Sequence, residues 1–134
     1  MCMYLGQYQT KFTGKGRVIL PKSVRKLAGN RIVLKKGLDG CVEGYSLSDW
    51  EKQNQNRFEL TQDRQDRFKN RFYLASMELV ELDSQGRFVI PPDMRKFSSI
   101  GDRVVIIGAG NHFEIWDFGI WKAHIKEIEG AYDR

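Results

Sequence analysis

The chain has 134 residues, with 22 Lys and Arg against 17 Asp and Glu, which gives a formal net charge of +5. This length suits one domain or two small halves sharing a core, and a hydrophobic content of 41% excludes a disordered chain. No apolar run is long enough to span a bilayer, and we expect no secretory signal. Two cysteines without a CxxC pair favour a reducing cytoplasm over a disulfide scaffold.

The basic residues are concentrated at the start of the chain. Residues 1–36 contain nine Lys or Arg and no Asp or Glu. Such a block predicts a surface that binds a polyanion, although a solvated, soluble face is the plainer alternative. The nine residues are Lys11, Lys15, Arg17, Lys22, Arg25, Lys26, Arg31, Lys35 and Lys36.

The first half of the chain predicts short strands and helices separated by Pro and Gly. A proline cannot donate to a strand ladder, so Pro21 should end the second strand, and the glycine turn at 37–40 should join a hairpin. Ser48 with Glu51 resembles a capping box at the start of a helix. The expected strands are Met3–Phe12, Arg17–Leu20, Arg31–Lys35 and Cys41–Tyr45, and the expected short helix is Lys22–Leu27.

A connector and a second half follow. The connector predicts a helix over Thr61–Leu74, with Asp63 in its first turn and Phe68, Phe72 and Leu74 facing the core. The second half then predicts the elements of the first in the same order, with a longer final helix. These are strands Met77–Leu82, Arg87–Ile90, Arg103–Ile107 and His112–Trp116, and helices Asp93–Phe97 and Asp117–Tyr132.

The chain therefore repeats itself once. The run GRVILP at 16–21 recurs as GRFVIP at 86–91, and Arg25-Lys26 recurs as Arg95-Lys96 at the same spacing. Each half is too small to bury its own strands, so we expect the halves to interlock into one pseudo-symmetric, mainly β core with helices. We divide the chain into a first repeat at 1–54, a helical connector at 55–76 and a second repeat at 77–134.

The turns that open the GR motifs are the candidate binding residues. Gly allows close backbone approach, Arg can bond guanine bidentately, and Lys contacts phosphate. Lys11, Lys15, Gly16 and Arg17 fit such DNA contacts, although the residues alone favour a plain hairpin turn with exposed charges, and the prediction of DNA contact depends on the family resemblance described below. Phosphate contacts are predicted from the helix that follows the first turn. The second turn is expected to bind DNA more weakly, because Glu81 and Asp83 lie close to it. The candidate DNA-binding residues are Lys22 and Arg25 on this helix, and Gly86 and Arg87 in the second turn.

Catalysis and cofactors have little support. His112 and His124 have no serine or cysteine pattern beside them, and we expect them in packing or at an interface. Cys41 and His112 occupy equivalent repeat positions, but a metal site there would need more ligands at suitable spacing. We predict no enzyme activity, no metal, no cofactor and no small-molecule substrate.

The ordered motifs resemble the MraZ family over nearly the whole chain. They include Tyr4-Leu5-Gly6-Gln7-Tyr8, Lys15-Gly16-Arg17, Leu82-Asp83-Ser84-Gln85-Gly86-Arg87 and His112-Phe113-Glu114-Ile115-Trp116-Asp117. The resemblance implies two AbrB-like halves in a swapped-hairpin β-barrel of the α+β class. It also implies a bacterial transcriptional regulator, cytoplasmic and nucleoid-associated. Its implied partners are double-stranded promoter DNA of the division and cell-wall gene cluster, bound at repeated boxes, and further copies of itself in a ring.

The chain departs from the family pattern at one position, and two other functions are alternatives to the one that the resemblance implies. The family turn has Asp four residues before its Arg, as in Asp83 and Arg87, but Thr13 stands in that position before Arg17. Arg17 should therefore be less neutralised, and we predict that the first half presents the stronger DNA surface. The rivals are an AbrB-like protein-interaction or antitoxin-type module, and a small enzyme.

Overall fold

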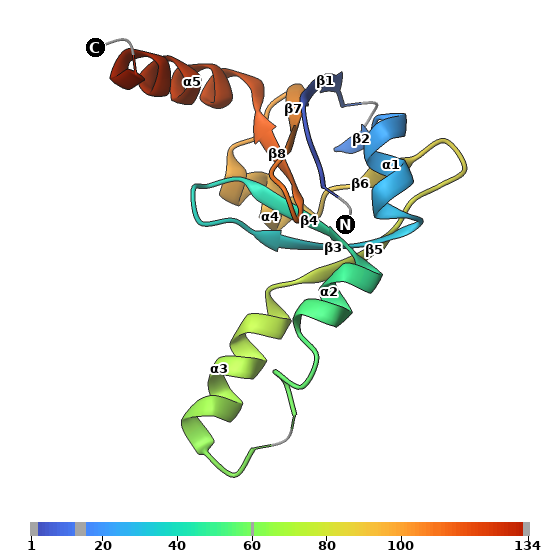
Figure 1. Ribbon diagram of the computed structural model, residues 1–134, viewed down its shortest axis with the longest axis vertical. Coiled ribbons are helices and arrows are strands. Elements are labelled where there is room, and N and C mark those ends of the chain that lie inside the picture. The colour runs from blue at the N-terminus through green and yellow to red at the C-terminus, as the bar shows by residue number, and fades with distance from the viewer. Residues whose placement is uncertain (1–2, 13–15, 60, 133–134) are drawn as a thin grey trace.

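A computed structural model describes residues 3–12, 16–59 and 61–132, which form two sheets and a set of helices (Figure 1). In the first half these are β1 (Gln7–Lys11), β2 (Arg17–Ile19), α1 (Lys22–Ala28), β3 (Arg31–Lys36), β4 (Val42–Ser46) and α2 (Leu47–Gln53). The connector forms α3 (Arg64–Ala75). In the second half they are β5 (Glu78–Glu81), β6 (Arg87–Val89), α4 (Pro92–Ser98), β7 (Arg103–Gly108), β8 (Phe113–Asp117) and α5 (Phe118–Tyr132).

The two halves exchange strands. The larger sheet runs in the order β1-β7-β8-β4-β3-β5, so β1 of the first half pairs with β7 of the second, and β5 pairs with β3. The hairpins β3–β4 and β7–β8 join where β4 pairs with β8. The smaller sheet is the ribbon of β2 and β6, again one strand from each half. The expected interlocking of the halves therefore agrees with the strand pairing.

The expected closed barrel is not found among the described residues. Strands β1 and β5 lie at opposite edges of the six-stranded sheet, and no pairing joins them. The β2–β6 ribbon forms a separate sheet and packs against the six-stranded sheet through side chains. The architecture is thus an open sheet with a covering ribbon.

One core lies between the ribbon and the sheet. Val18 and Phe88 point inward from the ribbon, while Ile32, Leu34 and Ile106 come from the sheet, and all five are buried. Burying side chains of this size stabilises the fold by about 1.5–3 kcal/mol each. The core therefore needs residues from both repeats.

The two prolines after the ribbon strands act as predicted. Pro21 and Pro91 each end a strand and stand immediately before a helix, where a missing N–H costs nothing. Helices α1 and α4 each present one buried face, through Val24 and Met94 respectively, to the shared core.

Two predicted helix starts were wrong. Helix α2 begins directly after β4, so Ser46 is its N-cap and accepts from the Asp49 N–H at 3.1 Å, and Ser48 does not cap it. Helix α3 begins later than predicted, with Asp63 as its N-cap rather than in its first turn. Both errors arise because a cap depends on where the preceding chain turns.

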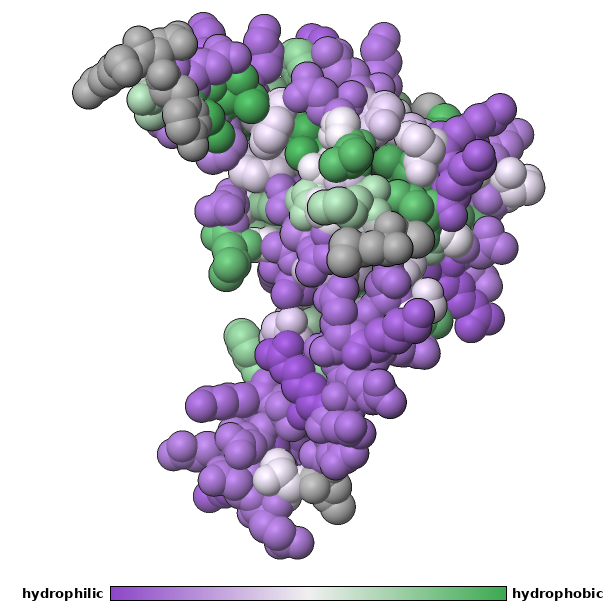
Figure 2. All heavy atoms as spheres, viewed as in Figure 1, coloured by the Kyte–Doolittle hydropathy of each residue, from purple (hydrophilic) through white to green (hydrophobic). Residues whose placement is uncertain are grey.

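The prediction that α3 faces the core was also wrong. Phe68 and Phe72 are 52% and 81% exposed, and Leu74 is exposed as well. Helices α2 and α3 form an arm that extends away from the sheets, and its surface is mostly hydrophilic (Figures 1 and 2). The apolar spacing of α3 therefore does not mark packing within this chain.

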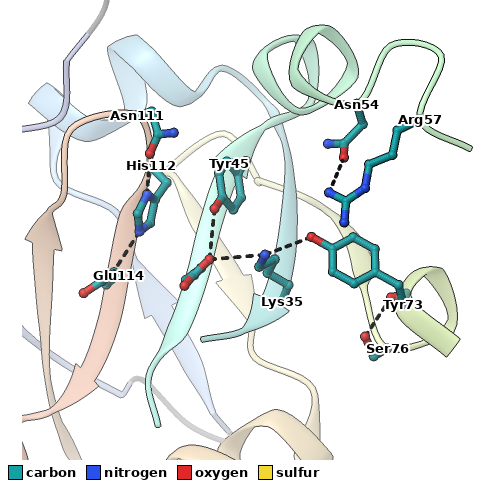
Figure 3. Close-up of polar contacts among 10 residues, drawn as sticks. Lys35, Tyr45, Asn54, Arg57, Tyr73, Ser76, Asn111, His112 and Glu114 are labelled. Carbon is teal, nitrogen blue, oxygen red and sulfur yellow. Dashed lines mark hydrogen bonds and ion pairs between the residues drawn. The ribbon is translucent and has the colours of Figure 1, made fainter. Parts of the chain in front are cut away.

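The base of the arm is held by stacked aromatic rings. Phe58 stacks between Trp50 and Tyr73, with ring centroids 6.0 and 5.7 Å away, and Lys35 of β3 donates to the Tyr73 hydroxyl at 2.9 Å (Figure 3). Helix α5 projects from the other side of the body, beyond β8 (Figure 1). Among the described residues, no helix is both long and apolar enough to cross a membrane.

Candidate nucleic-acid interface

The β2–β6 ribbon has one buried face and one outer face. Arg17 pairs with Val89, and Ile19 pairs with Arg87, so these four residues share the outer face. Backbone bonds extend the ribbon into both turns, since Leu20 donates to the Gly86 carbonyl at 2.9 Å and Ile90 donates to the Gly16 carbonyl at 3.0 Å. Gly16 and Gly86 are therefore both tied to the ribbon by backbone hydrogen bonds.

This arrangement places two arginines side by side. Arg17 and Arg87 occupy diagonal positions across the ribbon, which puts their Cα atoms roughly 7–8 Å apart. Arg17 is exposed and Arg87 is partly exposed. A two-stranded ribbon fits the DNA major groove, and arginine is the side chain best suited to guanine there.

The second turn is held by Asp83. Its Oδ1 accepts from the backbone N–H groups of Gln85 and Arg87, both at 2.9 Å, and its Oδ2 accepts from Arg87 Nε at 2.8 Å. The hydrogen bond from the Arg87 N–H is the main cause that lowers the pKa of Asp83. Arg87 is therefore oriented and partly neutralised, as the Asp-x-x-x-Arg spacing predicted.

The first turn is described only from Gly16 onward. Arg17 forms no ion pair with any of the described residues. Thr13 and Lys15, which the sequence analysis singled out, lie outside the described residues. Lys11, at the end of β1, is exposed and pairs across the sheet with Arg103.

Each turn is covered by an arginine from the other half. Gly16 and Gly86 are buried and have φ of +75° and +78°, the left-handed region that favours glycine. A Cβ on Gly86 would overlap Arg25 Cδ, and a Cβ on Gly16 would lie 2.5 Å from an Arg95 terminal nitrogen. The sites are therefore composite: Gly16 and Arg17 with Arg95, and Gly86 and Arg87 with Arg25.

The exchange of arginines between the turns changes where the charge of the basic block at 1–36 lies. Arg25 belongs to the first repeat in sequence, but its side chain crosses Gly86 of the second turn. The positive charge of the block is thus shared between both turns. Lys22 lies exposed at the start of the same helix, α1. Glu81, expected to oppose phosphate near the second turn, lies 3.6 Å from Arg31.

Sequence reasoning omitted Arg95 from the site. The repeat itself carried the signal, because Arg95 follows Gly86 by the nine residues that separate Arg25 from Gly16. The Nε atoms of Arg25 and Arg95 are both buried and lack a hydrogen-bond partner among the described residues. Each arginine stem is therefore packed in place over a glycine.

A second cluster of reactive side chains lies where β4 pairs with β8. Glu43 stands directly opposite Glu114, and one ligand atom from each of Cys41, Glu43 and Glu114 lies within 4.8 Å of the others. His112 Nε2 is 3.0 Å from Glu114 Oε2 (Figure 3). Sequence reasoning counted only Cys41 and His112 here, because the two glutamates meet only through strand pairing.

The protonation of this cluster follows from its burial. Removal from water is the main cause that raises the pKa of the Cys41 thiol to about 12, and the nearby glutamates add to it. The hydrogen bond from His112 is the main cause that lowers the pKa of Glu114, despite partial burial. At neutral pH the cluster therefore contains a neutral thiol beside an ionised carboxylate.

Comparison with protein families gives one match to each half. Residues 3–71 and 74–132 match the model described as "MraZ protein, putative antitoxin-like". The matched residues span almost the whole chain and agree with the duplication seen in the sequence and in the strand exchange. The chain therefore belongs to the MraZ family.

Proposed function

We propose that this MraZ-family chain is a sequence-specific, double-stranded DNA-binding transcriptional regulator with no catalytic role. The observation that carries the proposal is the outer face of the β2–β6 ribbon, where Arg17 and Arg87 occupy diagonal positions on the two paired strands. Its target is the promoter of the bacterial division and cell-wall gene cluster, and its place is the cytoplasm, with the nucleoid.

Base recognition and phosphate contact are divided among the residues. Arg17 and Arg87 on the ribbon read base edges, and a good bidentate pair with guanine discriminates by about 1–3 kcal/mol. Arg25 and Arg95 frame the two turns, and Lys11, Lys15 and Lys22 add phosphate contacts that carry no sequence information. Gly16 and Gly86, which are buried, leave room for Arg95 and Arg25 to lie over the turns.

One chain offers few contacts, so binding to repeated boxes needs several copies. We propose a homo-oligomeric ring, in which each added ribbon binds its box at a raised effective concentration. Apolar surface for such contacts is present on α3, through Phe68 and Phe72, and in a groove of about 420 Å³ between β1 and α5.

The test is a gel-shift titration with promoter DNA. Arg17→Ala is expected to abolish specific binding while the fold and the oligomer persist. Arg64→Ala is the matched control, because Arg64 is an exposed arginine on the distant α3 arm. Unchanged affinity for Arg17→Ala would refute the site. Binding must also weaken steeply with salt, with a slope of about −0.9 per neutralised phosphate, and a flat response would refute a phosphate-dominated interface.

The description of the matched family favours one rival, an antitoxin-type module whose main partner is a protein. The exposed phenylalanines of α3 would then serve that partner. Isolation of the native chain separates the two functions. A stoichiometric protein partner without promoter DNA would establish the rival, whereas co-purified promoter fragments would support the regulator.

A further inference from the structure

We propose that the junction of β4 and β8 binds a divalent transition-metal ion of the zinc class. The site is independent of the DNA-binding ribbon and lies where the two repeats meet. Each repeat contributes two ligands from equivalent positions 71 residues apart. The four ligands are Cys41, Glu43, His112 and Glu114.

The donor atoms have the right chemistry and nearly the right spacing. Thiolate sulfur, imidazole nitrogen and carboxylate oxygen are the three ligand types that zinc takes in proteins. Zinc bonds of 2.0–2.3 Å in a tetrahedron separate neighbouring ligand atoms by about 3.3–3.7 Å. His112 Nε2 and Glu114 Oε2 are already 3.0 Å apart, and the thiol and carboxylates lie within 4.8 Å of one another. His112 is joined to the other three ligands through Glu114, and a metal ion would have to draw the four side chains closer together.

Each of the two carboxylates accepts, through one of its oxygens, a hydrogen bond from a residue outside the proposed ligand set. The Tyr45 hydroxyl donates to Glu43 Oε1 at 2.9 Å, and at the equivalent position Trp116 Nε1 donates to Glu114 Oε1 at 3.0 Å. The Oε2 atom of Glu114 is thereby left toward His112, as Figure 3 shows. Partners of this kind orient metal ligands and raise their basicity.

The imidazole is oriented in the same way. Its ring stacks on Tyr45 with centroids 5.2 Å apart, and its Nδ1 is 2.6 Å from Asn111 Oδ1 (Figure 3). When Nδ1–H donates to Asn111, the neutral ring carries its lone pair on Nε2. Without metal, Nε2 makes the hydrogen bond to Glu114, so a metal ion would take the place of the proton on this nitrogen.

The charge of the cluster also favours a cation. Directly opposed carboxylates on neighbouring strands are destabilising, and Lys35 Nζ, 3.6 Å from Glu43 Oε1, offsets only one of them. Gly37 allows the chain to pack closely against the cluster, since a Cβ there would lie 2.6 Å from Cys41 Sγ and 3.1 Å from Glu43 Oε2.

Metal binding would release protons and would leave the site electrically neutral. The Cys41 S–H proton leaves to solvent as the sulfur–metal bond forms, and the proton that His112 donates to Glu114 leaves Nε2 as this nitrogen binds the ion. The thiolate and two carboxylates then carry three negative charges, which the divalent ion and Lys35 neutralise. Because ligands come from both repeats, the ion would fasten the two hairpins together.

The first test is a Co²⁺ titration of the full chain after chelation and reduction. We expect one equivalent to produce a thiolate-to-cobalt charge-transfer band that Zn²⁺ removes. Cys41→Ser should abolish the band, and Cys2→Ser, the matched control, should keep it. Absence of the band in the wild type, or its loss in Cys2→Ser alone, would overturn the proposal.

A second measurement tests the site even if the Cys41→Ser variant fails to fold. Glu114 is partly exposed, and Glu114→Gln keeps its shape, so this variant should fold. One equivalent of Zn²⁺ should raise the thermal midpoint of the wild type and of Cys2→Ser but not of Glu114→Gln. Tyr45→Phe, which removes an outer partner, should weaken Zn²⁺ binding about tenfold or more. Equal Zn²⁺ shifts in the wild type and Glu114→Gln would refute the site.

Discussion

Replacing Gly86 with alanine should uncouple the second turn from the arginine that crosses it. Gly86 has a φ of +78°, and its missing Cβ leaves room for Arg25 from the other repeat. An added methyl group would overlap Arg25 Cδ and would lie 2.6 Å from Arg25 Nε. The backbone is held by its bond to Leu20, so the arginine has to move.

The cost has two separable parts. A left-handed conformation costs a non-glycine residue about 1–2 kcal/mol. Forcing Arg25 from its rotamer adds about 0.5–1.5 kcal/mol. Gly86→Ala should therefore destabilise the fold by about 1.5–3.5 kcal/mol. Gly40→Ala should show the first part alone, because Gly40 has a φ of +83° and nothing within 4 Å of a built Cβ.

Urea unfolding of four variants measures the second part. These are Gly86→Ala, Gly40→Ala, Arg25→Ala and the double variant Gly86→Ala/Arg25→Ala. The double-mutant cycle should give a coupling of about 0.5–1.5 kcal/mol, with the arginine truncation relieving part of the glycine variant's cost. Strict additivity, or equal losses in Gly86→Ala and Gly40→Ala, would show that Arg25 does not pack on the second turn.

Three further predictions concern single groups. Asp83→Asn removes the charge beside Arg87, so DNA binding should tighten and its salt slope should steepen by up to about one unit. Ser46→Ala should cost about 1 kcal/mol in thermal or urea unfolding, while Ser48→Ala should cost much less, because only Ser46 caps α2. In metal-free protein, burial keeps the Cys41 thiol protonated, so its folded pKa exceeds its unfolded value. Wild type should therefore lose stability relative to Cys41→Ser as pH rises from 9.0 toward 12, by at most about 1.4 kcal/mol per pH unit, and parallel pH profiles would contradict this.

The repeat made much of the fold predictable. Matching runs around Gly16 and Gly86 indicated equivalent strands and helices, and the structure has them with ends shifted by one to a few residues. Each end depends on prolines, glycines and apolar spacing within a few positions. Such signals are local, so they can be read without knowing the partner strand.

The errors occurred where a local pattern had two possible outcomes. The apolar spacing of α3 predicted a core-facing helix, but Phe68 and Phe72 are exposed on an arm that leaves the body. Amphipathic spacing shows that a helix has an apolar face, and it does not show what covers that face. Likewise, Ser46 and Ser48 both suited a cap, and the end of β4 decided between them.

The sequence by itself determined the duplication, the paired GR turns, the Asp83–Arg87 contact and the position of the basic block along the chain. Only the tertiary structure decided which residues share a site. It placed Arg25 over Gly86, Arg95 over Gly16, and Glu43 against Glu114. These contacts join residues about 60 to 80 positions apart. They exist because neither repeat can bury its own strands, and exchanging strands satisfies the backbone hydrogen bonds and the shared core together.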